Sequence, residues 1–216
     1  MSWIVTPQLM ALNGIPQENI LGIAFGGGYF AGYISHTANG NPTHALIVAP
    51  RATGQSSTPL QSKTSFTSTS GTDSMFNGVA NTNAMVTSGI NNHPAAKFCK
   101  DLTIGGYTDW YLPSIYELSI AYFNLKPGTT SNDTSWGANP YAVPRRNSNY
   151  TTTNPTQTSV VNFRTSAAES FGIDTFWTST ESSSTTSWGV NFNTGNERAF
   201  TKTDTLYVRA FRRITL

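Results

Sequence analysis

The segment from Gly106 to Leu118, which reads GYTDWYLPSIYEL, constrains the fold of this chain more than any other. Ser114 is followed three residues later by Glu117, which is the pattern of a capping box. Apolar residues then recur at helical spacing as far as Leu125, and a Lys-Pro-Gly sequence ends the pattern. The sequence therefore predicts a helix over about residues 114–125.

Large apolar residues near this segment indicate a core that the helix covers. Pro113 reverses the chain ahead of the helix, so we expect Trp110 and Leu112 to point inward. Trp177 and Trp188 are too large to be exposed at low cost in hairpins, and we expect them in the same core. We interpret seven residues of these segments and of the C-terminal strand as the framework of the fold: Trp110, Leu112, Pro113, Glu117, Trp177, Glu181 and Arg212.

Short apolar runs bounded by turn residues predict mainly antiparallel strands around two helices. The other helix is expected to begin at Pro94, a residue that favours the first helical position. Strands are expected at residues 20–25, 29–34, 45–49, 175–179, 187–192, 198–201 and 207–214. Two polar stretches, 52–74 and 127–160, are expected to be long surface loops. These elements predict an α+β fold.

The order of these elements divides the 216 residues into three parts. Residues 1–20 hold two prolines between short apolar stretches, and we expect an arm that docks on a neighbour. Residues 21–89 are expected to form a β-rich extension that contains the long Ser/Thr loop. Residues 90–216 are expected to form the main domain.

The composition is typical of exposed proteins that are rich in strands or loops. Charged residues make up 11% of the chain, against roughly 25% in an average soluble domain. A net charge of +2 gives no electrostatic basis for binding nucleic acid. We expect no membrane insertion, because no apolar run approaches a span of about 18 residues, and no secretory signal is visible. An extracellular-like composition without an export signal favours a phage virion, with the bacterial cell surface as the alternative location.

The combined motifs resemble a known family. Residues 106–118, the FWTSTE sequence at 176–181, Trp188, Phe192 and residues 208–213 are similar to the family named for the C-terminal domain of collagen-like bacterial adhesins. The resemblance covers about residues 90–216. It implies a C-type-lectin-like fold related to the formylglycine-generating enzyme. It also implies a place among adhesins and phage proteins, including binding proteins diversified by retroelements.

The chain lacks the sequence motifs of common catalytic and cofactor sites, so we expect no enzyme activity, cofactor or metal. Gly26-Gly27-Gly28 is not followed by Gly-Lys-Ser/Thr, which favours close backbone approach over phosphate binding. The three histidines fit no metal motif, and no Gly-x-Ser-x-Gly is present. Cys99 is alone and is expected to be buried, so it cannot supply a reactive cysteine pair. Glu181 is expected to pair with Arg209 or Arg213 rather than to bind calcium or sugar.

The C-terminal hairpins carry the residues that we expect to bind a ligand. They mix adaptable polar groups with rigid aromatic rings, as antibody paratopes do. The candidates are Ser184, Trp188, Asn191, Asn193, Asn196, Arg198 and Phe200. The alternative, that the asparagines and threonines there are ordinary turn residues, stays open.

These features predict a non-catalytic receptor-recognition or attachment module of a phage particle, at a tail fibre, a tail tip or a surface decoration. The expected partners are a host cell-surface receptor or glycan and, through the N-terminal region, other virion proteins. A homo-oligomer is expected, with a trimer favoured. The alternatives are a purely structural virion protein, a bacterial surface adhesin and a carbohydrate-active enzyme.

Overall fold

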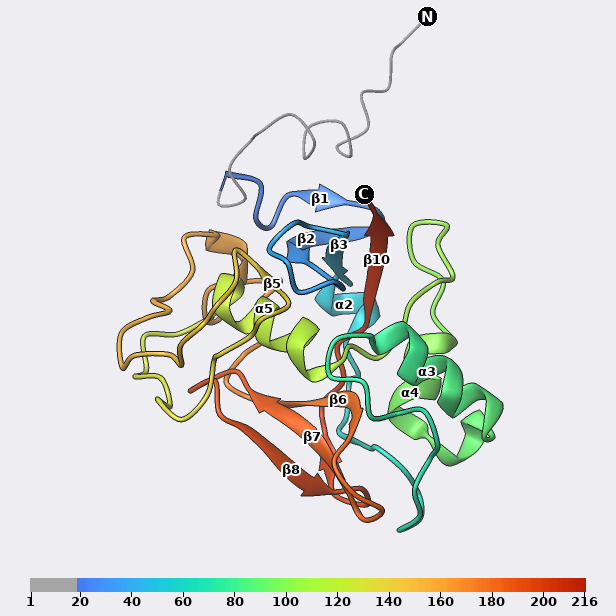
Figure 1. Ribbon diagram of the computed structural model, residues 1–216. Coiled ribbons are helices and arrows are strands. Elements are labelled where there is room, and N and C mark those ends of the chain that lie inside the picture. Colours follow the sequence, from blue (N-terminus) through green and yellow to red (C-terminus); the bar gives the residue numbers. More distant parts are fainter. Residues whose placement is uncertain (1–18) are drawn as a thin grey trace, which may run out of the picture.

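The computed structural model describes residues 19–216, so the predicted N-terminal arm lies almost wholly outside the described residues. A sheet of five strands forms one side of the molecule (Figure 1). Its strands are β1 (Ala24–Phe25), β2 (Gly28–Ile34), β3 (His44–Val48), β10 (Phe211–Thr215) and β5 (Ala142–Val143). The order is β1-β2-β3-β10, all pairs are antiparallel, and β5 pairs with β2. The last strand of the chain thus pairs with β3 of the predicted extension.

A second antiparallel sheet lies on the other side of helix α5 (Figure 1). It has the order β6-β7-β8, formed by β6 (Thr175–Glu181), β7 (Thr186–Asn191) and β8 (Glu197–Thr201). A short pair, β4 (Leu60–Gln61) with β9 (Thr205–Leu206), adds a further ladder. The predicted strands of both sheets are confirmed, with shifts at their ends. The exceptions are residues 20–23, which form a turn before β1, and residues 207–210, where only isolated bridges precede β10.

The helices are α2 (Arg51–Gly54), α3 (Gly78–Thr87), α4 (Pro94–Lys100) and α5 (Ile115–Leu125), with short 3-10 turns η2 (Ile90–Asn92) and η3 (Val161–Phe163). Both predicted helices are confirmed as α4 and α5, and the α+β class is confirmed. Helix α3, which lies in the range expected to be a β-rich extension, was not predicted. Its sequence, GVANTNAMVT, buries Asn81 and Thr82 beside Met85, so it shows no apolar stripe.

The capping box at the start of α5 is confirmed, and it does more than begin the helix. The backbone N–H of Ser114 donates to Glu117 Oε2 at 2.8 Å, and the Glu117 N–H donates to Ser114 Oγ at 3.5 Å. Glu117 also accepts from the backbone N–H of Gly78, at 3.1 Å, and from the Tyr111 hydroxyl, at 2.9 Å. Burial raises the pKa of this carboxyl. A single buried glutamate therefore joins α5 to α3 and to the segment before Pro113.

The large framework residues are buried as expected, with one exception. Trp110, Leu112 and Trp177 are fully buried in one apolar cluster. Trp188 is only half-buried, packs against the other cluster and contacts Trp136 edge to face. The expectation of a shared core is wrong for Trp188. Trp177 pairs with Gly189 and shares its face of the sheet, so Trp188, the residue before Gly189, must point to the opposite face.

The framework charges pair differently from the prediction for Glu181. Its carboxylate lies 2.9 Å from Lys202 Nζ, not beside Arg209 or Arg213. Arg209 pairs with Glu169 at 2.9 Å, and Arg213 lies 3.9 Å from Glu117. Arg212, which is buried, makes two bonds to Asp109, at 2.8 and 3.0 Å. The prediction for Glu181 is wrong because its carboxylate faces a distant loop, where the Thr69 N–H and the Thr72 hydroxyl donate to it.

That loop, residues 52–74, is not the simple surface loop that its composition predicts. It contains α2 and β4, and the side chain of Lys63 is buried within it. Lys63 Nζ donates to the carbonyls of Thr67 and Ser68 and to Thr69 Oγ1, at 2.7 to 3.1 Å. Lys202 Nζ donates to the same Thr67 carbonyl at 2.9 Å. Two buried ammonium groups therefore fix this polar segment.

Two smaller predictions are confirmed. Cys99 is fully buried, and burial raises the pKa of its thiol. The glycine run at residues 26–28 turns the chain between β1 and β2, with positive φ angles of 59° and 84° at Gly26 and Gly27. A Cβ atom on Gly28 would lie 2.2 Å from the carbonyl oxygen of Val48, so this position needs glycine for close backbone approach.

Candidate binding surface

A hollow of about 630 Å³ opens where the β7–β8 turn meets the loop at residues 131–133. We call it the turn hollow. Its lining is polar apart from one aromatic ring and contains five of the seven predicted ligand-binding residues. The lining residues are Ser131, Asn132, Asp133, Thr175, Asn191, Asn193, Thr194, Asn196, Arg198 and Phe200.

Asn191 forms the structural centre of the turn. Its Oδ1 accepts from the backbone N–H groups of Asn193, at 2.9 Å, and Thr194, at 3.0 Å. Its Nδ2 donates to Thr175 Oγ1 at 3.0 Å. An asparagine that bonds to the backbone two residues ahead stabilises a turn, so the turn-residue interpretation holds for Asn191.

Asn196 and Asp133 join the turn to the distant loop. Asn196 Nδ2 donates to Asp133 Oδ2 at 2.6 Å, and the Asp133 N–H donates to the Thr194 carbonyl at 2.8 Å. The hydrogen bonds from Asn196 and from the Ser135 N–H lower the pKa of the Asp133 carboxyl. Asp133 is therefore a carboxylate at neutral pH, and its position is fixed.

Arg198 and Asn193 present polar groups that the protein does not use. The guanidinium of Arg198 is exposed and lies 4.5 Å from the centre of the Phe200 ring. Phe200 in turn contacts buried Trp177 edge to face. Among residues 19–216, neither the Arg198 guanidinium nor the Asn193 side-chain amide has a hydrogen-bonding partner. The turn hollow thus offers a cation on an aromatic ring, a free amide and a fixed carboxylate.

The two remaining predicted residues lie elsewhere. Ser184 is in the β6–β7 turn, where it lines a separate hollow of about 320 Å³ with residues 68–73. Trp188 points to the face of the β6-β7-β8 sheet that packs on the main core, whereas Arg198 is paired with Gly189 and shares the other face. The structure therefore brings together Asn191, Asn193, Asn196, Arg198 and Phe200, without Ser184 and Trp188.

Sequence reasoning missed the opposite wall of the turn hollow. Ser131, Asn132 and Asp133 lie about 60 residues before the hairpin, inside a stretch predicted as a long loop. Their polar sequence resembles many other short stretches of the chain. The bonds that join Asp133 to Asn196 and to the Thr194 carbonyl make them part of the site.

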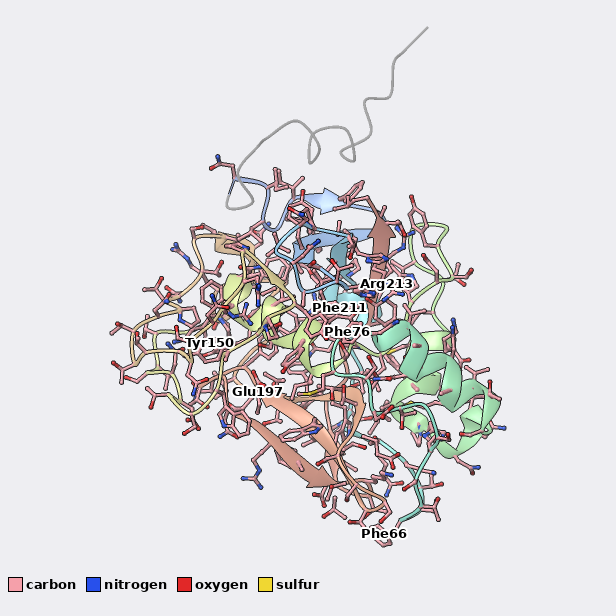
Figure 2. All side chains as sticks on the ribbon, in the orientation of Figure 1. Phe66, Phe76, Tyr150, Glu197, Phe211 and Arg213 are labelled. Carbon is pink, nitrogen blue, oxygen red and sulfur yellow. The ribbon has the colours of Figure 1, made fainter. Side chains whose placement is uncertain are left out.

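Glu197 lies on the buried side of β8, next to the turn hollow in sequence but not in space. In Figure 2 it lies below Tyr150, in the region covered by the loops around α5. Its side chain is 4% exposed, and Oε1 has no hydrogen-bonding partner among the described atoms. Burial raises the pKa of Glu197 to about 7, although Ser119 and Arg146 act against that shift.

The part of the chain that is described gives no support for a metal site or for a membrane-spanning helix. Residues 19–216 contain no group of three His, Cys, Asp or Glu side chains placed to hold a metal ion. Within the same range, each helix is too short or too polar to cross a membrane. The chemistry that the turn hollow supports is recognition through hydrogen bonds, one cation and one aromatic ring.

Comparison with known families agrees with this architecture. The family model described as the Lcl C-terminal domain matches residues 72–212. The match begins before residue 90 and includes α3, the helix that the sequence did not reveal. This family is C-type-lectin-like, is related to the formylglycine-generating enzyme and sulfatase fold, and is found in bacterial adhesin-like proteins. A search of curated proteins found no match.

Proposed function

The chain belongs to the Lcl C-terminal domain family, and from that premise we propose that it is a non-catalytic recognition module that binds a host cell-surface receptor or glycan through the turn hollow. The observation that carries this proposal is the contrast within the hollow. Asn191, Asn196 and Asp133 are locked by hydrogen bonds, while Asn193 and Arg198 keep their groups for a ligand. A rigid frame with unused donors lowers the entropy cost of binding.

The finer proposal is that this module serves a phage particle. The low charge content and the abundance of hydroxyl and amide side chains support an exposed virion surface. In this proposal the N-terminal region contacts other virion proteins, and the chain forms a homo-oligomer, with a trimer favoured. Sequencing sibling isolates tests whether retroelements diversify it, since substitutions should then gather around the turn hollow.

Three other functions differ from this one in measurable ways. A bacterial surface adhesin would be found on the producing cell, and a structural virion protein would be in the particle without binding any host surface. A carbohydrate-active enzyme would hydrolyse a surface polysaccharide. Imaging virions labelled against this chain separates the adhesin from the proposed function, and an assay of binding to host surfaces separates the structural virion protein from it.

A binding experiment tests the turn hollow directly. Fluorescently labelled protein is applied to host cells and to a glycan array, and compared with the Asn193→Ala, Arg198→Ala double variant. Neither substituted side chain has a protein hydrogen bond among the described residues, so the variant should melt at the same temperature. We expect a loss of affinity of at least about tenfold, because a charged donor and an amide are removed.

Ser184→Ala is the matched control, since Ser184 is equally exposed but lines another hollow. It should bind as the wild type does. Equal binding by the wild type and the double variant would contradict the proposal for the turn hollow. Loss of binding in Ser184→Ala alone would move the contact to the β6–β7 turn.

A further inference from the structure

A second hollow, of about 650 Å³, lies beside α5, and we call it the arginine hollow. It is bounded by the C-terminal half of α5, by β5 and the residues after it, and by the loop at 154–159. In Figure 1 this is the region where α5 and β5 are covered by the yellow and orange loops. It shares none of its lining residues with the turn hollow.

Three arginines line the arginine hollow: Arg145, Arg146 and Arg164. No aspartate or glutamate is among its described lining residues. None of the three arginines belongs to an ion pair in the range 19–216, whereas Arg209, Arg212 and Arg213 each have a carboxylate within 4 Å. Positive charge is therefore concentrated here without a paired anion, in a protein whose net charge is only +2.

Arg146 forms the inner part of this charge. Its Nε donates to the Gly137 carbonyl at 2.9 Å, and Nη2 donates to Ser119 Oγ at 2.8 Å. Its guanidinium also lies 4.8 Å from the centre of the Phe123 ring. The carboxylate of Glu197 interacts electrostatically with Arg146. Because burial raises the pKa of Glu197 to about 7, its negative charge balances the positive charge of Arg146 only in part near neutral pH.

Arg145 and Arg164 form the outer part. Both are exposed, and Arg164 is held by a hydrogen bond from Nε to the Thr158 carbonyl at 2.9 Å. Arg145 has no hydrogen-bonding or ionic partner among the described residues. Planar guanidinium groups bind carboxylates and phosphates through paired N–H donors, so arginines that have no carboxylate partner and surround one hollow favour an anionic ligand.

The remaining walls add an apolar component. Ile120 and Phe123 come from α5, and Pro144 and Pro155 come from the flanking loops. We propose that the arginine hollow is a second binding site, which takes a small organic anion: a carboxylate or phosphate ester attached to an apolar body. The charged group would contact the arginines, and the apolar body would cover Phe123 and the prolines.

Titration of the full chain with three probes tests this site. Phenyl phosphate and benzoate carry an anion on the same aromatic body, and benzyl alcohol carries none. At low ionic strength, where screening is weak, either anion should shift the backbone amide NMR signals of residues 142–143, 145–146 and 156–159. Benzyl alcohol should bind more weakly, and the stronger of the two anions identifies the preferred charged group.

Arg145→Gln and Arg164→Gln should each weaken binding of the better anion by about fivefold, since each removes one charged donor. Arg198→Gln, in the turn hollow, should leave it unchanged and so separates this site from the proposed function. The proposal fails if benzyl alcohol binds equally well, if neither anion binds, or if both folded variants keep the wild-type affinity. Signal shifts confined to residues 191–200 would also overturn it.

Discussion

Adjacent residues on β8 have opposite roles because side chains alternate across a strand. Arg198 is exposed in the turn hollow, while Glu197 is buried against Ser119 and Arg146. Burial disfavours the charged form of the Glu197 carboxyl, and one of its oxygens has no hydrogen-bonding partner among the described residues that could offset this cost. The folded state therefore holds the proton on Glu197 over a pH range in which the unfolded chain has lost it.

The pH dependence of stability should reveal Glu197. Its pKa is raised from 4.5 to about 7, so its contribution is fully present below pH 4.5 and is lost as the pH rises through 7. The loss amounts to about 3 kcal/mol. Glu197→Gln cannot ionise, so its free energy of unfolding, relative to the wild type, should increase by up to that amount between pH 4.5 and pH 8.

The relevant measurement is the difference between the two proteins, from denaturant unfolding at several pH values. His36, His44 and His93 have pKa values lowered to about 4, so they add stability as the pH rises and oppose the trend of the wild type. The contributions of these histidines are the same in both proteins, so they cancel when the free energy of unfolding of one protein is subtracted from that of the other. Parallel pH profiles for the variant and the wild type would show that Glu197 titrates normally.

At the scale of elements, the loop at residues 62–74 depends on two buried lysines. Lys202 contacts the Glu181 carboxylate and the Thr67 carbonyl, and its side chain is 1% exposed. Removing one partner of a buried pair leaves the other charge without compensation. This loop lies beside the β6–β7 turn, so its position also fixes the hollow that contains Ser184.

Lys202→Met should lower the free energy of unfolding by about 3 kcal/mol and make residues 62–74 sensitive to protease. Lys97→Met is the matched control, because Lys97 pairs with Asp101 on the surface and its side chain is 41% exposed. That change should cost less than about 1 kcal/mol. Equal losses in the two variants would show that the buried pair does not hold the loop.

Elements with strong local signals were predictable from the sequence, and those that depend on distant partners were not. The capping box at Ser114 and the alternating strands of the hairpins are local patterns, and the structure confirms them. Helix α3 buries polar side chains that are satisfied by distant partners, such as Asn81 on the Ser74 carbonyl, so its sequence shows no apolar stripe. The role of Asp133 in the site could not be predicted from the sequence either, because it depends on a hydrogen bond from the distant residue Asn196.

At the scale of the whole molecule, α5 separates the two sheets, and the candidate sites lie around the second sheet and the loops beside α5 (Figure 1). The C-terminal strand β10 is in the first sheet, paired with β3, so the extension and the main domain share one ladder. The turn hollow thus lies across α5 from the end of the chain.

The most direct test of the recognition surface is hydroxyl-radical footprinting of the protein bound to intact host cells. Phe200 lies in the turn hollow, and Tyr107 provides an internal reference because it is 39% exposed and lies over Arg212 of β10, in the other sheet. Our account predicts that binding protects Phe200 from oxidation and leaves Tyr107 unchanged. Protection of Tyr107 with no change at Phe200 would contradict it.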